Sequence, residues 1–354
     1  MATRPKIKVL IVDDSALVQR VLSTELSKCE DIEVVGTATD PFVARDKILQ
    51  LSPDVLTLDI EMPRMDGLSF LKKLMQHRPM PVVIVSSLAP ANGDVAMRAL
   101  SLGAVEVVPK PGSQFSVPEV QGQLATAIRA AAVAKLQPRS GTHAKADSTN
   151  APALQTTDKI VAIGASTGGT RAVEAILSAL PPNMPGVLIV QHMPAGFTEL
   201  FAKRLATVSR MAVREARDGD LIAPGLALVA PAGKHTLLMR SGGHYVARVK
   251  DGAPVQFQRP SVDVMFHSAA KAAGANAVGV LLTGMGQAGA HGLAAMRAAG
   301  AHTIAESEAT AVVFGMPRAA IEIGAAVEVL PLDRIARTLV HHFREATVFT
   351  GVSR

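Results

Sequence analysis

Short apolar runs alternate with amphipathic stretches through the first third of the chain. The apolar, β-branched runs, which predict buried strands, are Ile7–Val12, Ile32–Ala38, Val55–Leu58, Val82–Val85 and Val105–Val108. The stretches between them, in which apolar residues recur every three or four positions, are Ala16–Leu26, Val43–Leu51, Leu68–His77 and Ala91–Leu102. Repeated strand–helix units of this kind predict a doubly wound, mostly parallel α/β sheet.

The pattern stops near Ala131 and resumes near Asp158. The intervening segment contains Ala, Pro, Ser, Thr, Gly and scattered charges without either period, which is typical of a flexible interdomain linker. Beyond it, a second α/β domain is indicated by strand-like runs at Ile160–Ile163, Val187–Val190, Leu226–Val229, Ala277–Leu282 and His302–Ala305. One stretch, His235–Val249, differs because two strand-like runs flank Ser-Gly-Gly, which predicts a hairpin that forms an antiparallel edge.

Length and composition agree with two globular domains. The 354 residues exceed the usual size of one domain. A composition of 48% hydrophobic and 19% charged residues is typical of a globular protein with a sizeable core. Aromatic residues make up only 3% and tryptophan is absent, so a surface that stacks nucleobases is not expected. The single cysteine, Cys29, excludes an internal disulfide and a thiolate zinc site, and it fits a reducing compartment.

Two further features bear on location and partners. No apolar stretch approaches the roughly 18 residues of a membrane helix, and the chain starts with a strand pattern rather than a signal peptide, so we expect a cytoplasmic protein without membrane insertion. Residues 1–125 carry 13 Lys and Arg against 15 Asp and Glu, and the remainder carries 23 against 15. The basic second part is compatible with nucleic acid or with an acidic protein partner.

Polar residues follow several strands of the first domain at the point where each strand ends. Asp13 and Asp14 close the first strand, Asp59 the third and Ser86 the fourth, and Lys110 follows the fifth. Carboxyl ends of parallel strands meet at one sheet edge, where three carboxylates repel one another unless a cation joins them. Oxygen ligands favour a hard ion such as Mg²⁺, while Lys110 and Ser86 would face a phosphoryl group accepted by Asp59.

This constellation resembles the receiver domain of two-component response regulators over about residues 5–128. The residues that carry the resemblance are, in order, Asp13, Asp14, Asp59, Met62, Pro63, Gly67, Ser86, Lys110 and Pro111. The resemblance implies a flavodoxin-like fold with Mg²⁺ held by Asp13, Asp14, Asp59 and a backbone carbonyl near Glu61. It also implies that a partner histidine kinase phosphorylates Asp59, and that Ser86 and Lys110 sense the phosphoryl group.

A serine stands at the first strand-to-helix turn of the second domain. The strand Ile160–Ile163 runs directly into Gly-Ala-Ser-Thr-Gly-Gly, with Ser166 at the third position, and a helical pattern begins at Arg171. A Gly-x-Ser-x-Gly sequence at such a turn exposes a hydroxyl beside the backbone N–H groups of the helix start. Taken alone the turn could equally be a glycine-rich phosphate cradle, although it lacks the Lys of a Walker loop.

A histidine follows the next strand at the corresponding position. Val187–Val190 ends at Gln-His-Met, so His192 reaches the same sheet edge as Ser166 if the two strands are neighbours. There an imidazole can take the serine proton and return it to a leaving group. The strand Ala277–Leu282 ends in Thr-Gly-Met-Gly-Gln-Ala-Gly, a turn whose backbone N–H groups suit an oxyanion hole.

Residues of about 158–348 resemble the catalytic domain of the chemotaxis protein-glutamate methylesterases. The shared motifs are Gly-Ala-Ser-Thr-Gly-Gly, Gln-His-Met, Thr-Gly-Met-Gly, Arg-Pro-Ser-Val-Asp at Arg259–Asp263 and Phe-Gly-Met-Pro at Phe314–Pro317. A receiver joined to this domain by a linker, here 129–157, is that family's architecture, and the resemblance implies a Rossmann-like three-layer fold. It also implies Ser166 as nucleophile, His192 as base and then acid, and an oxyanion hole from the backbone of Thr167 and Met285.

One position departs from the family pattern. The family's third triad residue is an aspartate in Met-Gly-x-Asp-Gly, and this chain has Ala288 there, which neither orients nor stabilises an imidazolium. In a serine-protease triad the corresponding loss lowers turnover on the order of 10⁴-fold yet leaves measurable catalysis, so we expect a weakened site. Candidate substitutes for the missing group are Gln287, Asp263, Glu306 and Glu308.

The function that the resemblance implies is phosphorylation-controlled hydrolysis of glutamyl γ-methyl esters on chemoreceptors, with deamidation of selected glutamines. No cofactor is expected in the catalytic domain, and the unphosphorylated receiver is expected to cover the Ser166 cleft. Two alternatives stay open. One is a weakened or inactive module that acts by protein interaction, motivated by Ala288. The other is a DNA-binding response regulator, motivated by the basic second part, although no short helix-turn-helix region is evident.

Overall fold

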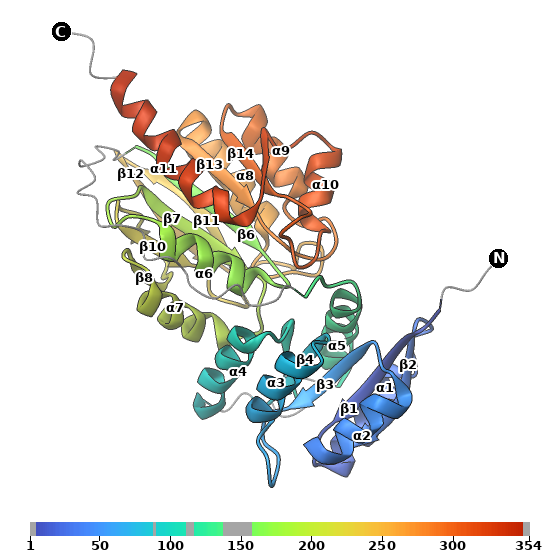
Figure 1. The fold of residues 1–354 in the computed structure, drawn as a ribbon. Helices are drawn as coiled ribbons and strands as arrows, with labels where there is room; N and C mark the ends of the chain where they lie inside the picture. The colour runs from blue at the N-terminus through green and yellow to red at the C-terminus, as the bar shows by residue number, and fades with distance from the viewer. Residues whose placement is uncertain (1–4, 88–89, 111–116, 137–157, 350–354) are drawn as a thin grey trace. The chain divides into compact units, whose positions relative to one another are not determined.

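The protein is described here by a computed structural model over residues 5–87, 90–110, 117–136 and 158–349. The chain divides into two compact units, Met1–Pro138 and Arg139–Arg354. Each unit has a parallel sheet flanked by helices (Figure 1). The segment 129–157, expected to be a linker, lies mostly outside the described residues, and its residues 129–132 belong to helix α5, Val117–Ala132.

The first unit contains a five-stranded parallel sheet in the order β2-β1-β3-β4-β5. Its strands are β1 Ile7–Val12, β2 Ile32–Ala38, β3 Val55–Asp59, β4 Val82–Ser86 and β5 Glu106–Pro109. Its helices besides α5 are α1 Ala16–Leu26, α2 Pro41–Leu51, α3 Gly67–His77 and α4 Pro90–Leu102. Helix α1 packs on α5 and α3 packs on α4, as expected for a doubly wound sheet (Figure 1).

Local sequence explains where these elements begin and why they are buried. Ser15, Asp40 and Asp66 cap α1, α2 and α3, because each side chain accepts a backbone N–H of the first turn. Every residue of β3 and β4 is buried. Strands covered by helices on both faces need apolar side chains throughout, which accounts for the continuous apolar runs.

The second unit contains a seven-stranded parallel sheet in the order β15-β14-β13-β6-β7-β10-β8. Its strands are β6 Ile160–Ala165, β7 Gly186–Gln191, β8 Ala212–Glu215, β10 Leu226–Val229, β13 Ala277–Leu281, β14 His302–Glu306 and β15 Glu328–Leu330. Its helices are α6 Gly169–Ala179, α7 Phe197–Val208, α8 Val262–Ala273, α9 Ala290–Ala298, α10 Met316–Glu322 and α11 Leu332–Phe349. Helices α7 and α11 pack on α6, whereas α8 and α10 pack on α9 (Figure 1).

The predicted hairpin exists, but it does not lie at an edge of the main sheet. β11 His235–Ser241 and β12 His244–Lys250 pair antiparallel. β12 also pairs with β9 Asp220–Leu221, so the three strands form a separate sheet and the predicted edge placement is wrong. The edges of the main sheet are β8 and β15, whose short, half-exposed sequences gave no strand signal.

Strand order creates one switch point in each unit. The order reverses between β1 and β3 in the first sheet and between β6 and β13 in the second. Ligands of open α/β sheets bind beyond the carboxyl ends of the strands at such a point. At the first switch point, Asp13 follows β1 and Asp59 is the last residue of β3. At the second, Ser166 follows β6.

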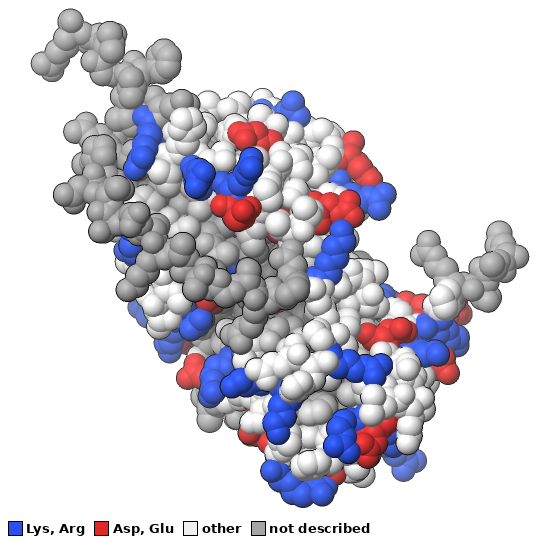
Figure 2. Space-filling view, viewed as in Figure 1, with Lys and Arg blue, Asp and Glu red and all other residues white. Residues whose placement is uncertain are grey.

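Two surface properties bear on possible partners. No helix within the described ranges is long and apolar enough to span a membrane. On the face shown in Figure 2, the coloured basic and acidic side chains are interspersed, and neither sign forms a continuous field. The net positive charge of the chain is therefore not gathered into one patch on this face.

Candidate functional site

The predicted carboxylates of the first unit meet at the carboxyl edge of its sheet. Asp13, Asp14 and Asp59 each offer an oxygen atom, and these oxygens lie within 4.8 Å of one another. Asp13 and Asp59 are buried, whereas Asp14 is exposed. Three carboxylates beside a single ammonium group leave an excess of negative charge on oxygen donors, which fits a hard divalent cation.

Lys110 lies between two of these carboxylates. Its Nζ is 2.9 Å from Asp13 Oδ2 and 2.8 Å from Asp59 Oδ2, as ion pairs that lack the alignment of hydrogen bonds. Burial raises the pKa of Asp59, and Lys110 opposes this shift. Burial by itself would lower the pKa of Lys110, but the two carboxylates outweigh it and raise that pKa, so the lysine stays cationic.

Ser86 and Glu61 lie next to the same carboxylate cluster. Ser86 is buried at the end of β4, and its carbonyl accepts the Lys110 N–H at 2.9 Å. Asp59 pairs with Val85 in the β3–β4 ladder, which brings Ser86 to the same edge. The Glu61 N–H donates to Asp59 Oδ1 at 3.3 Å. The structure thus brings together Asp13, Asp14, Asp59, Glu61, Ser86 and Lys110. Pro111, which also carries the receiver resemblance, lies outside the described residues.

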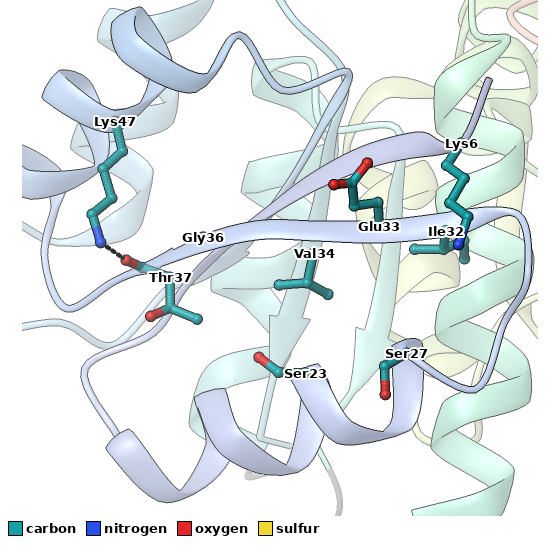
Figure 3. Close-up of a pocket in the computed structure, with 9 residues that line it drawn as sticks. All are labelled: Lys6, Ser23, Ser27, Ile32, Glu33, Val34, Gly36, Thr37 and Lys47. Atoms are coloured by element: carbon teal, nitrogen blue, oxygen red, sulfur yellow. Dashed lines mark hydrogen bonds between the residues drawn. The ribbon is translucent and has the colours of Figure 1, made fainter.

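A hollow of about 680 Å³ lies elsewhere on the first unit, along edge strand β2. Lys6 and Lys47 lie toward its two ends, and Lys47 donates a hydrogen bond to the Thr37 carbonyl (Figure 3). Ser23 of α1 and Ser27, the residue after α1, also line it. None of the predicted site residues lines this hollow. It is therefore separate from the carboxylate cluster.

Ser166 lies on a sharp turn between β6 and α6 in the second unit. Its N–H donates to the Thr283 carbonyl at 3.0 Å, and its carbonyl accepts the Gly169 N–H at 2.7 Å. Gly168 has a φ of +80°, a left-handed conformation that lets α6 begin directly after the serine. The turn therefore places a half-buried hydroxyl at the start of a helix, as predicted for a nucleophile.

His192 follows β7 directly beside this turn. Ala165 and Gln191 are partners in the β6–β7 ladder, and the His192 N–H donates to the Ala165 carbonyl at 3.0 Å. The imidazole is buried, and its Nε2 has no hydrogen-bond partner among the described residues, Ser166 included. Burial lowers the pKa of His192 to about 4. The ring is therefore neutral near pH 7, which is the form that a general base requires.

Gln191 connects the serine and the histidine, a role that the sequence did not suggest. Its Nε2 donates to the Ser166 carbonyl at 2.8 Å and to the His192 carbonyl at 3.0 Å. Because both partners are acceptors only, the nitrogen and not the oxygen of the carboxamide must face them. A Cβ on Gly169 would come within 2.2 Å of Gln191 Oε1, so glycine is required there. The available signal was a polar residue at the end of an otherwise apolar strand.

The loop that follows β13 packs against the serine turn. Thr283 Oγ1 donates to the Thr167 carbonyl at 2.9 Å, and a Cβ on Gly284 would come within 2.8 Å of Ser166 Cβ. The N–H groups of Thr167 and Met285 take part in no backbone hydrogen bond within the described parts of the chain. An oxyanion hole beside Ser166 would require N–H groups that are not bonded elsewhere.

Ala288 is buried near the end of this loop and offers no polar side chain to His192. Asp263 does not replace the missing group, because its Oδ2 accepts the Gly289 N–H at 2.7 Å and its Oδ1 accepts the Gly292 N–H at 2.8 Å. These bonds hold the start of α9. Two other candidate substitutes, Gln287 and Glu308, have exposed side chains.

Glu306 is fully buried at the end of β14. Its Oε2 accepts the Thr283 N–H at 2.9 Å and its Oε1 accepts the Thr310 hydroxyl at 3.0 Å. Three strand spacings, about 14 Å, separate β14 from β7, so this carboxyl does not reach His192. Burial raises the pKa of Glu306 to about 7, although the hydrogen bonds from Thr283 and Thr310 oppose the shift.

The fold and the two sheet edges define a response regulator whose second unit is an α/β domain with a serine and a histidine at one strand-end cleft. Residues 9–119 match the response regulator receiver domain, and residues 161–339 match the CheB methylesterase family. The chain belongs to the family of protein-glutamate methylesterases/protein-glutamine glutaminases.

Individual relatives support this assignment over nearly the whole chain. Protein-glutamate methylesterase/protein-glutamine glutaminase 2 of Syntrophus aciditrophicus is 53% identical over 95% of this chain and 98% of its own length. The corresponding protein 3 of Burkholderia lata is 51% identical over 100% of both chains. The crystal structure of the Thermotoga maritima CheB methylesterase catalytic domain is 40% identical and covers 52% of this chain and 97% of its own, with a TM-score of 0.51. These matches confirm the predicted family and assign the second unit to a methylesterase rather than a DNA-binding domain.

Proposed function

We propose that this chain hydrolyses glutamyl γ-methyl esters on chemoreceptors in the cytoplasm, deamidates selected glutamines of the same receptors, and is controlled by phosphorylation. The observation that carries the proposal is the placement of Ser166, at the switch point of a parallel sheet, next to His192 at the end of the neighbouring strand β7. The proposed domains are a receiver at 5–128, a linker at 129–157 and a catalytic domain at 158–348.

Ester hydrolysis would proceed in two steps at Ser166. His192 takes the hydroxyl proton as Oγ attacks the side-chain carbonyl, and the N–H groups of Thr167 and Met285 hold the oxyanion. His192 then protonates the departing methoxide, which leaves as methanol. A water molecule, deprotonated by the same imidazole, attacks the acyl-serine and releases the glutamate. Deamidation follows the same steps with ammonia as the leaving group.

The absence of a carboxylate at position 288 sets the expected efficiency of this site. An imidazolium forms transiently in each step. No carboxylate of the described residues offsets the burial that disfavours the charged form of His192. Gln191 still holds the two residues in register through their carbonyls. The proposal is therefore an active enzyme with reduced turnover, and the interaction module is the alternative that Ala288 leaves open.

The carboxylate cluster of the first unit supports a phosphoryl-acceptor role for Asp59. Asp59 would attack the phosphorus of a histidine kinase's phosphohistidine and form an acyl phosphate, while Lys110 and Ser86 contact the phosphoryl oxygens. Asp13, Asp14, Asp59 and the Glu61 carbonyl would hold Mg²⁺, which supplies charge neutralisation between carboxylates and phosphoryl oxygens. Phosphorylation would shift the population of the chain from a covered to an accessible Ser166 cleft.

The test is methanol release from membranes that carry methylated chemoreceptors, measured with and without a small phosphodonor. We expect release by the full chain, faster with the phosphodonor, and none above background by Ser166→Ala. Ser178→Ala is the matched control, because its hydroxyl bonds only within α6. Equal release by Ser166→Ala would contradict the assigned nucleophile. If the full chain releases no methanol under either condition, the interaction module replaces the enzyme as the preferred function.

A further inference from the structure

The turn at 255–258 carries an aromatic side chain that is almost completely exposed. Phe257 is 99% exposed, more than any other large apolar residue in the described parts of the chain. We infer that Phe257 is a docking residue for the receptor helix that carries the substrate ester. This inference rests on the proposed function, because it names how the substrate of the Ser166 site is held.

The backbone of this turn is held in a conformation that L-residues rarely adopt. Gln256 has a φ of +50° and Phe257 a φ of +63°, and neither is glycine. Two hydrogen bonds of 3.0 Å, from Val255 N–H to the Gln258 carbonyl and back, close the turn. Left-handed conformations of such residues are unfavourable and persist where the surroundings fix them. Phe257 is therefore presented on a rigid turn rather than on a loose loop.

The base of the turn is fastened to the second unit by a single buried histidine. His235 Nε2 donates to the Ala253 carbonyl at 2.9 Å, and His235 Nδ1 accepts the Ser261 N–H at 3.2 Å. The Arg259 guanidinium also donates to the Gly252 carbonyl at 2.8 Å. Both ends of the segment are thus pinned, which lowers the entropy that a binding partner would have to remove.

The turn emerges at the same sheet edge as the serine. Helix α8 starts at Val262 and leads into β13, so its N-terminus lies at the carboxyl edge of the parallel sheet. A Cβ on Gly164 would lie 2.2 Å from Val262 Cγ1, and a Cβ on Gly289 would lie 2.6 Å from the same atom. The Val262 side chain therefore packs directly against both glycines. Gly164 is in β6, and Gly289 ends the loop after β13. The turn therefore leads into a helix start that packs between β6, the strand that ends just before Ser166, and the loop after β13.

The charges around the base of the 255–258 turn fit a partner helix that carries carboxylates beside apolar positions. Lys234, Lys250 and Arg259 are exposed around the base of the turn and outnumber the exposed Asp251. Because the turn leads into α8 at the sheet edge where Ser166 lies, we expect a receptor helix that delivers a side chain to Ser166 to pass this turn. An exposed aromatic ring with neighbouring cations is the kind of anchor that dominates protein interfaces.

The test compares Phe257→Ser with Ile323→Ser in the full chain. Ile323 is 48% exposed and caps the C-terminal end of α10, which lies at the opposite edge of the sheet. Two substrates are used: methylated chemoreceptor membranes and a soluble N-acetyl glutamate γ-methyl ester. Phe257→Ser should raise KM for the receptor membranes about fivefold to tenfold, as for a typical interface anchor, and leave hydrolysis of the small ester within twofold. Ile323→Ser should change neither.

Other outcomes overturn the inference in distinguishable ways. An unchanged receptor KM excludes a docking role, and an equal loss on both substrates makes Phe257 a structural residue of the cleft. A raised basal rate without a phosphodonor would mean that the turn holds the receiver domain instead. Co-sedimentation of Ser166→Ala with receptor membranes is measured in parallel, with and without Phe257→Ser. If the wild-type chain fails to release methanol but this binding still depends on Phe257, the proposed activity fails while the docking surface stands.

Discussion

The two candidate sites occupy equivalent places in their sheets but are held together in different ways. Each lies at the carboxyl ends of parallel strands at a switch point. In the first unit, charged side chains contact one another, with Lys110 within 3 Å of both Asp13 and Asp59. In the second unit, neutral hydrogen bonds to the backbone fix the turn, and no described carboxylate faces His192.

The two sites are expected to differ in how they tolerate substitution. The chemistry of the first site resides in particular charged atoms, so removal of one of them removes the reaction. The geometry of the second site resides in backbone groups fixed by Gln191 and Thr283, so the loss of a carboxylate at position 288 leaves the other groups in place.

The largest effect is expected for Asp59→Asn in the first unit. An amide is not a nucleophile toward phosphorus, so incorporation of phosphoryl from a small phosphodonor should fall to background. The measurement is the mass increase of the intact chain, and Asp94→Asn, an exposed aspartate on α4, is the control. Undiminished incorporation by Asp59→Asn would mean that another carboxylate accepts the phosphoryl group.

A smaller but still large loss is expected for Gln191→Leu in the second unit. The variant removes two neutral hydrogen bonds, each worth about 1 kcal/mol, so kcat should fall about 30-fold while KM for receptor membranes changes little. Gln287→Leu is the matched control, since that exposed glutamine bonds neither to Ser166 nor to His192 in the described structure. Equal losses in the two variants would mean that Gln191 has no specific role in positioning Ser166 and His192.

Ala288→Asp tests whether the missing carboxylate limits turnover. We expect methanol release to rise at least tenfold, because an aspartate beside the imidazole would stabilise its protonated form. The acid limb of the kcat/KM profile should also move to higher pH, since that anion raises the pKa of His192 from about 4. Ala288→Asn is the uncharged control. If the rate and the limb both stay unchanged, position 288 does not act on His192.

The same contrast explains how much of the molecule the sequence could predict. The strands of both sheets were found because apolar runs buried on both faces leave a strong pattern, as in β3 and β6. The short edge strands β8 and β15 were missed because their half-exposed residues carry no such pattern. The carboxylates of the receiver were predictable because their position at strand ends and their charge together imply one kind of chemistry.

The parts of the second site that were missed depend on hydrogen bonds to the backbone. The amino-acid sequence does not indicate that the Gln191 amide donates hydrogen bonds to two backbone carbonyls, or that the Thr283 hydroxyl donates to the Thr167 carbonyl. The four substitutes considered for the missing aspartate could be ranked only once strand order was known. Asp263 is used at the start of α9, and Glu306 lies three strands away from β7.

Glu306→Gln probes a buried carboxyl of the second unit and is expected to change turnover least, because its effect is on stability. The folded-state pKa of Glu306 is about 7 against a usual value of about 4.5, so the folded protein favours the protonated carboxyl. This contribution is complete below pH 4.5 and is lost as the pH rises through 7, by about 3 kcal/mol.

Gln imitates the protonated acid, so the Tm of the second unit should match wild type near pH 4.5 and exceed it by several degrees at pH 8. Scanning calorimetry of the full chain measures this, with the exposed Glu308→Gln as control. A Tm difference that does not change between these two pH values would show that Glu306 is ionised in the folded state throughout. In that case the Thr283 N–H compensates the buried charge, as Lys110 does for Asp59 in the first unit.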